Sequence, residues 1–155
     1  EMLISHDYFK KNVPGFEKSY IVLTNPQLGT RGSRRVVGEY VLTEKDMNTN
    51  VPFGDTIAVF PDVDRGQESL KYPLTYMPYR CMIPRKVNNL LVACRAFSSN
   101  AVANNFFNYI PHCIALGEAA GIAAAQSISS GLDLRKIDVK ALQASLKKHG
   151  AILPG

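Results

Sequence analysis

Residues 88–128, NNLLVACRAFSSNAVANNFFNYIPHCIALGEAAGIAAAQSI, decide the predicted fold. Residues 90–93 form an apolar run without alternation, which is typical of a strand buried on both faces of a sheet. Pro111 suits the first turn of a helix and Gly131 suits a helix end, so a helix of about five turns is predicted between them. A buried strand leading through a loop to a helix N-terminus is how α/β proteins bind phosphate groups and nucleotide-type cofactors.

Small residues follow one face of this predicted helix. Gly117, Ala120, Gly121 and Ala124 recur at spacings of three and four, so they share a stripe that another backbone can approach closely. A sandwiched cofactor needs such an approach, and so does tight packing of a helix on a sheet. The spacing alone leaves both interpretations open.

Three segments, taken in order, resemble one enzyme family. The runs VNNLLVACR (87–95) and IPHCIALGEAAGIAAA (110–125) are similar to the C-terminal segment of FAD-dependent oxidoreductases of the glutathione-reductase-like flavoprotein superfamily. The runs NVPGFEKSYIVLTNPQLGTRGSRRVVGEYVLTEKD (12–46) and YMPYRCMIPRKVNNLLVACR (76–95) resemble the segments that precede that helix in the same proteins. The resemblance extends from about Val13 to Pro154 and rests on the ordered set.

The resemblance implies an α/β fold in which residues 51–155 form the C-terminal part of an FAD-binding Rossmann-like domain. Residues 1–50 would be an attached β-rich piece of the substrate or cap domain. In this family the helix N-terminus faces the pyrimidine edge of the flavin, where the helix dipole favours the negative charge of the reduced ring. The positions matching cofactor-binding residues are Cys94, Arg95, Ser98, Asn108, Pro111, His112, Cys113 and Ile114.

The chain departs from the family pattern at several positions. Cys94 stands where better-known members have glycine, which adds a side chain near the expected pyrophosphate. Ala101 and Val102 replace a His-Glu pair, and Asn108 replaces an arginine that could hold an anion. We therefore expect a different substrate, or chemistry located elsewhere. The alternative function is a non-catalytic scaffold or binding module that has lost the cofactor.

Arg34, Arg35 and His112 are the catalytic candidates. A guanidinium can bind a carboxylate through two hydrogen bonds or donate a proton beside a flavin, and it can equally form a structural ion pair. On a strand, Arg34 and Arg35 would point to opposite faces, so only one could face a site. The resemblance implies hydride transfer between flavin and a small organic substrate, anionic if these arginines contact it.

The length of 155 residues suits one domain, and no G-x-G-x-x-G fingerprint occurs in the sequence. We therefore expect the chain to be a C-terminal fragment of a longer parent, inactive alone, with the N-terminal FAD-binding half as its partner. A second copy of the chain is a further expected partner.

The composition is typical of a globular protein and argues against a membrane span and a nucleic-acid partner. The chain is 46% hydrophobic and 20% charged, near the values of ordinary globular domains. No apolar run approaches the roughly 20 residues of a membrane span, and no signal peptide is visible, so a cytoplasmic protein is predicted. Cys81, Cys94 and Cys113 lack C-x-x-C spacing, which predicts buried free thiols and no metal site. The net charge of +5 is dispersed along the chain, which argues against a nucleic-acid partner.

The remaining elements are predicted from local patterns. Strands are expected over 19–25, 35–42 with a bulge at Gly38, and 56–60, and a polar loop over 61–73. Thr43 followed by Asp46 predicts the start of a short helix. Asp138 precedes a final amphipathic helix with Val139, Leu142 and Leu146 on its inner face, ended by Gly150.

Overall fold

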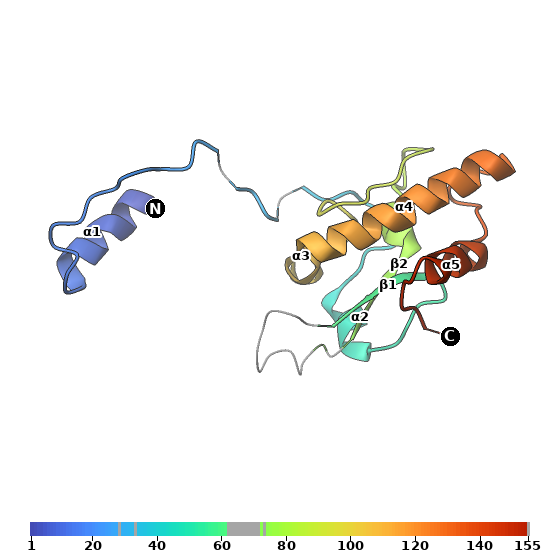
Figure 1. The fold of residues 1–155 in the computed structure, drawn as a ribbon, viewed down its shortest axis with the longest axis horizontal. Coiled ribbons are helices and arrows are strands. Elements are labelled where there is room, and N and C mark those ends of the chain that lie inside the picture. Colours follow the sequence, from blue (N-terminus) through green and yellow to red (C-terminus); the bar gives the residue numbers. More distant parts are fainter. Residues whose placement is uncertain (28, 33, 62–71, 73, 155) are drawn as a thin grey trace. The chain divides into compact units, whose positions relative to one another are not determined.

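The computed structural model describes residues 1–27, 29–32, 34–61, 72 and 74–154 (Figure 1). The chain forms two compact units, Glu1–Thr30 and Arg31–Gly155. The first unit holds helix α1 (Met2–Asn12), none of whose residues is buried. Phe9 and Phe16 pack together there, with ring centroids 5.4 Å apart. The assignment of residues 1–50 to a substrate or cap region stays a prediction.

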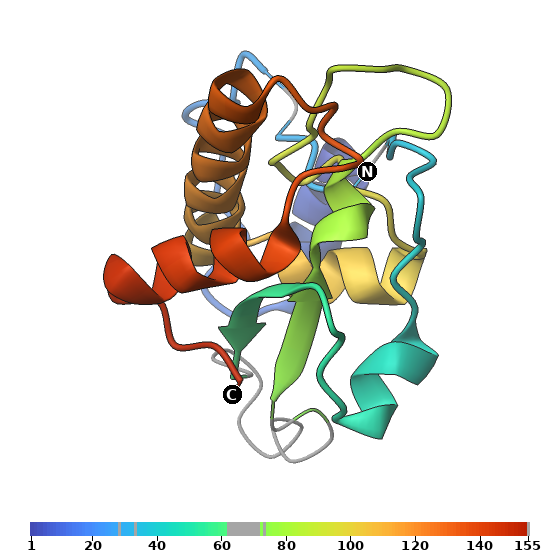
Figure 2. The same cartoon turned by 90° about the vertical axis from the view of Figure 1, so that its right-hand side faces the viewer.

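The second unit is a mixed α/β assembly around a two-stranded antiparallel sheet, β1 (Thr56–Phe60) with β2 (Thr75–Pro78). Helices α4 (Ile110–Ser130) and α5 (Val139–Lys148) pack against each other, and both contact β1 (Figure 2). Helix α3 (Ala101–Phe107) contacts α2 (Glu44–Thr49). A 3-10 helix, η2 (Tyr79–Met82), follows β2 directly.

The helix ends follow from local capping chemistry. Gly131 ends α4 with a φ of 67°, a left-handed conformation that glycine adopts without a steric penalty. Thr43 and Asp46 form the predicted capping box of α2. The Asp138 side chain accepts hydrogen bonds from the N–H groups of Lys140 and Ala141 at the start of α5. The predictions of these helices are confirmed, as is the strand over residues 56–60.

Aromatic rings fill the core beside the start of α4. Phe107 is fully buried, with its ring centroid 5.0 Å from that of Phe106 and 5.7 Å from that of Phe60. His112 is 2% exposed, and its ring lies 4.2 Å from the Phe60 ring. Leu142 and Leu146 of α5 are buried in the same core, as predicted. This packing fixes the position of the first turn of α4.

Three predicted strands are wrong. Residues 90–93 lie in a loop, Leu90 is 44% exposed, and the N–H of Val92 donates to the Met82 carbonyl at 2.8 Å in place of a strand ladder. Residues 19–25 form no strand and expose Val22 and Leu23. Residues 35–42 make two isolated bridges, one of them between Gly38 and Pro84. A strand requires consecutive pairing with a neighbouring backbone, which a local apolar pattern does not specify.

The small-residue stripe of α4 makes no close backbone contact among the described residues. No heavy atom lies within 4 Å of the place where a β-carbon would stand on Gly117 or Gly121. Ala120 and Ala124 are half-buried.

The predicted loop over 61–73 falls almost wholly outside the described residues. None of the helices in the described chain has the length and apolar character needed to cross a membrane.

Candidate functional site

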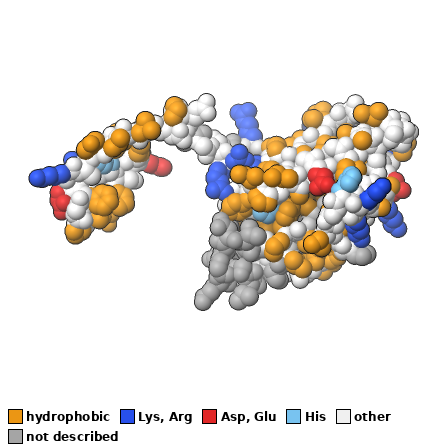
Figure 3. Space-filling model, viewed as in Figure 1, with side chains coloured by type: hydrophobic (Ala, Val, Ile, Leu, Met, Phe, Trp, Pro, Cys, Tyr) orange, Lys and Arg blue, Asp and Glu red, His pale blue; other side chains and the backbone are white. Residues whose placement is uncertain are grey.

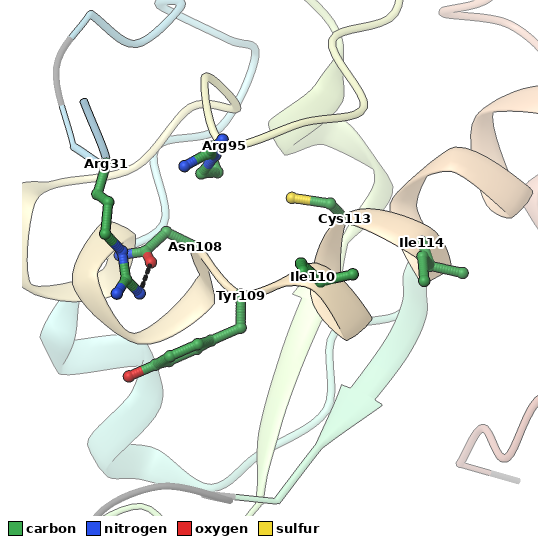
Figure 4. A pocket seen from close by; sticks show the side chains of 7 residues that line it. All are labelled: Arg31, Arg95, Asn108, Tyr109, Ile110, Cys113 and Ile114. Carbon is green, nitrogen blue, oxygen red and sulfur yellow. Dashed lines mark hydrogen bonds between the residues drawn. The ribbon is translucent and has the colours of Figure 1, made fainter. Parts of the chain in front are cut away.

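A pocket of about 560 Å³ lies at the N-terminal end of α4 (Figure 4). Its wall combines the junction between α3 and α4, the first turn of α4, and two side chains from distant loops. The lining residues are Arg31, Arg95, Asn108, Tyr109, Ile110, Cys113 and Ile114. The volume lies within the range of small-molecule and cofactor sites, roughly 300–1,000 Å³.

The chain turns sharply between the two helices, and this turn exposes the helix end. Asn108 ends α3, and Tyr109 stands at the N-cap of α4 with extended backbone angles. Among the described residues no side chain caps α4, and Pro111 lies in its first turn. The first N–H groups of an α-helix have no partner within the helix. The positive end of the α4 dipole therefore adjoins the pocket.

Arg31 reaches this turn from 77 residues away in the sequence. Its Nη2 donates to Oδ1 of Asn108 at 2.7 Å, and its guanidinium lies 5.2 Å from the centroid of the Tyr109 ring. Nδ2 of Asn108 donates in turn to the Asn105 carbonyl at 3.1 Å. Figure 4 shows the guanidinium beside the Asn108 amide and over the tyrosine ring. The hydrogen bond and the ring together hold Arg31 at the edge of the pocket.

Arg95 supplies a second positive charge on the other side of the pocket. Its carbonyl accepts a hydrogen bond of 2.8 Å from Nδ2 of Asn104, a residue only 1% exposed. The Cys113 sulfur points toward the side of the pocket where Arg95 lies (Figure 4). Burial raises the pKa of the Cys113 thiol, while the Arg95 charge lowers it. The thiol therefore favours its protonated form at neutral pH.

The structure brings together only part of the predicted cofactor site. Arg95, Asn108, Cys113 and Ile114 line the pocket. Cys94 and Pro111 are exposed and are not among the lining residues. Ser98 and His112 are buried elsewhere.

The two buried residues have structural contacts. Ser98 is fully buried, and its Oγ accepts the Gly38 N–H at 2.9 Å. His112 packs among the aromatic rings beside β1. Their proposed roles toward a cofactor stay predictions.

The arginines that line the pocket, Arg31 and Arg95, differ from the predicted catalytic pair. Arg34 is exposed, Arg35 is half-buried, and neither lines the pocket. Arg34 and Arg35 do not face opposite sides of a strand, because their segment forms no strand. Arg31, Tyr109 and Ile110 are the pocket residues that sequence reasoning missed. Arg31 lies three residues before Arg34, and this local group of arginines was the available signal.

Comparison with known proteins identifies the family. A family model described as "FAD dependent oxidoreductase" matches residues 4–146, which is most of the chain. Neither a curated protein nor a solved structure matches it. FAD is the cofactor that this family implies. With an electropositive pocket at an uncapped helix end and a match over nearly its whole length, the chain belongs to the family of FAD-dependent oxidoreductases.

Proposed function

We propose that this chain is the C-terminal part of a flavoenzyme that transfers hydride between a small organic substrate and FAD. In this proposal the flavin ring lies against the pocket at the start of α4. Family membership supports the oxidoreductase role and the cofactor. The observation that carries the proposal is the uncapped N-terminus of a 21-residue helix opening on a pocket with two arginines.

The residues present fit a flavin. The pyrimidine edge of the ring has oxygen and nitrogen acceptors and gains negative charge on reduction. The start of α4 offers N–H donors and a positive dipole end, and Arg95 adds a full charge. Ile110 and Ile114 offer apolar surface to a planar ring. FAD, when bound, supplies the hydride acceptor or donor at N5.

The groups that line the pocket would then have distinct roles toward the bound flavin. The first turn of α4 and Arg95 stabilise negative charge on the bound ring. Ile110 and Ile114 exclude water from its face, which strengthens those electrostatic interactions. Cys113, protonated because burial raises its pKa, adds no negative charge beside the ring.

We further propose that a separate part of a longer parent supplies the Rossmann-like half with the glycine-rich fingerprint. The parent would then resemble the glutathione-reductase-like superfamily. Two features support this extension. The sequence contains no G-x-G-x-x-G, and the described sheet has two strands, fewer than a dinucleotide-binding fold uses.

Thiol labelling tests whether FAD covers the pocket. We expect FAD to slow the alkylation of Cys113 by N-ethylmaleimide in the full-length protein, in a Cys94→Ser background. With free FAD at about 100 times its Kd, labelling should slow about 100-fold if only the empty pocket reacts. Mass spectrometry of the Cys113 peptide measures the rate.

A reporter away from the pocket is the control. Lys136 is exposed and does not line the pocket. A Lys136→Cys reporter, with Cys94 and Cys113 changed to serine, should react equally fast with and without FAD. Equal rates at Cys113 in the two states, with FAD shown to be bound, would place the flavin elsewhere and contradict the proposal.

A further inference from the structure

The pocket combines cationic and apolar side chains. Arg31 and Arg95 supply the positive charge, and Tyr109, Ile110 and Ile114 supply apolar surface. Figure 3 shows Lys and Arg side chains beside hydrophobic ones on the end of the larger unit where α4 begins. No acidic residue is among the described residues that line the pocket. Such a surface complements a molecule with one anionic end and an apolar body.

Arg31 has unused capacity for an anion. Among the described residues, neither Arg31 nor Arg95 forms an ion pair. A guanidinium carries five N–H donors, and the described contacts of Arg31 use one of them, on Asn108. Arg31 is exposed to solvent, so its remaining donors are accessible.

The contacts of Arg31 also orient it. The Asn108 amide accepts from one edge of the guanidinium, and the Tyr109 ring lies 5.2 Å from its carbon. Holding the planar group in place reduces the rotational freedom that is lost on binding. A carboxylate can accept two parallel hydrogen bonds from the remaining N–H groups of the guanidinium.

We propose that Arg31 binds the carboxylate of the substrate, and that the substrate is a carboxylate with an apolar body. This inference rests on the proposed function, because it assigns the substrate class of the same site. The flavin ring occupies the side formed by Arg95 and the start of α4, and the substrate carboxylate binds Arg31. The pyrophosphate of FAD is the other source of an oxyanion, and the experiment separates the two.

The test uses benzoate as the probe and benzamide as its neutral isostere. Calorimetry measures their binding to the full-length protein, and absorbance measures FAD binding separately. We expect benzoate to bind and benzamide to bind at least tenfold more weakly, because a hydrogen bond to a charged group is stronger than one to a neutral group. Arg31→Gln should weaken benzoate binding by roughly 10–100-fold. Arg31→Lys should restore only part of that loss.

Arg85→Gln is the matched control, because Arg85 is exposed and lies outside the pocket lining. It should leave benzoate binding unchanged, and Arg31→Gln should lower the affinity for FAD much less than the affinity for benzoate. Equal benzoate affinity in the two variants, or no benzoate binding to the wild type, would overturn the inference. A large loss of FAD affinity in Arg31→Gln would assign the arginine to the cofactor and also overturn it. Failure of the wild type to bind FAD, with benzoate binding intact, would contradict the proposed function alone.

Discussion

Replacement of Phe107 by alanine is expected to lower the free energy of unfolding by about 3–5 kcal/mol, the largest effect anticipated for a single substitution in this chain. Phe107 is fully buried, and its ring contacts those of Phe60, Phe97 and Phe106 with centroids 5.0 to 6.0 Å apart. Alanine would remove that apolar surface and leave a cavity that a packed core closes only in part. Chemical denaturation followed by circular dichroism measures the loss.

Val102→Ala on the same helix is the control. Val102 is 41% exposed, so its truncation should change the free energy of unfolding by no more than about 0.5 kcal/mol. Because Asn108 and Tyr109 directly follow Phe107, the Phe107→Ala variant should also disturb the pocket. Similar losses of stability for both variants would mean that the core described around Phe107 is incorrect.

Substitution of Gly38 by alanine is expected to destabilise the fold by about 1–3 kcal/mol through overpacking. A β-carbon on Gly38 would lie 2.7 Å from Cβ of Ser98 and 3.1 Å from the Ile83 carbonyl oxygen. The Gly38 N–H donates to Oγ of Ser98 at 2.9 Å, so the two segments of the chain cannot move apart without losing a buried hydrogen bond. The midpoint of thermal or chemical unfolding reports the change.

Gly54→Ala is the matched control. Gly54 is exposed, has no atom within 4 Å of the place of a β-carbon, and does not have a positive φ. The same substitution there should be neutral or stabilise by up to about 1 kcal/mol, by restricting the unfolded chain. If Gly38→Ala were as well tolerated as Gly54→Ala, the close contact between the segments of Gly38 and Ser98 would not exist.

The sequence predicts α2, α4 and α5 because their signals are local, but it misses α3, which lies in residues 95–109, a segment predicted to be a loop. Pro111 and Gly131 bracket α4, and Asp138 begins α5, each through contacts within a few residues. Strands depend on a partner backbone, and local apolar runs do not specify one. Residues 90–93 therefore have the composition of a buried strand and form a loop.

In the candidate site, too, the sequence predicts the residues that are close together in the chain and misses a contact between distant positions. Arg95, Asn108, Cys113 and Ile114 lie near the helix start, where the family resemblance predicts cofactor contacts. Arg31 could not be placed because its contact with Asn108 spans 77 residues. A hydrogen bond between such distant positions depends on the packing of the whole unit.

The most direct measurement of the central claim is the chromophore content of the full-length protein that contains this chain. The protein is purified, its visible spectrum is recorded, and any chromophore released by heat is identified and quantified. The account predicts a yellow protein that releases stoichiometric FAD. A folded, colourless protein that also fails to bind added FAD would contradict it, and would favour a scaffold that has kept the fold and lost the cofactor.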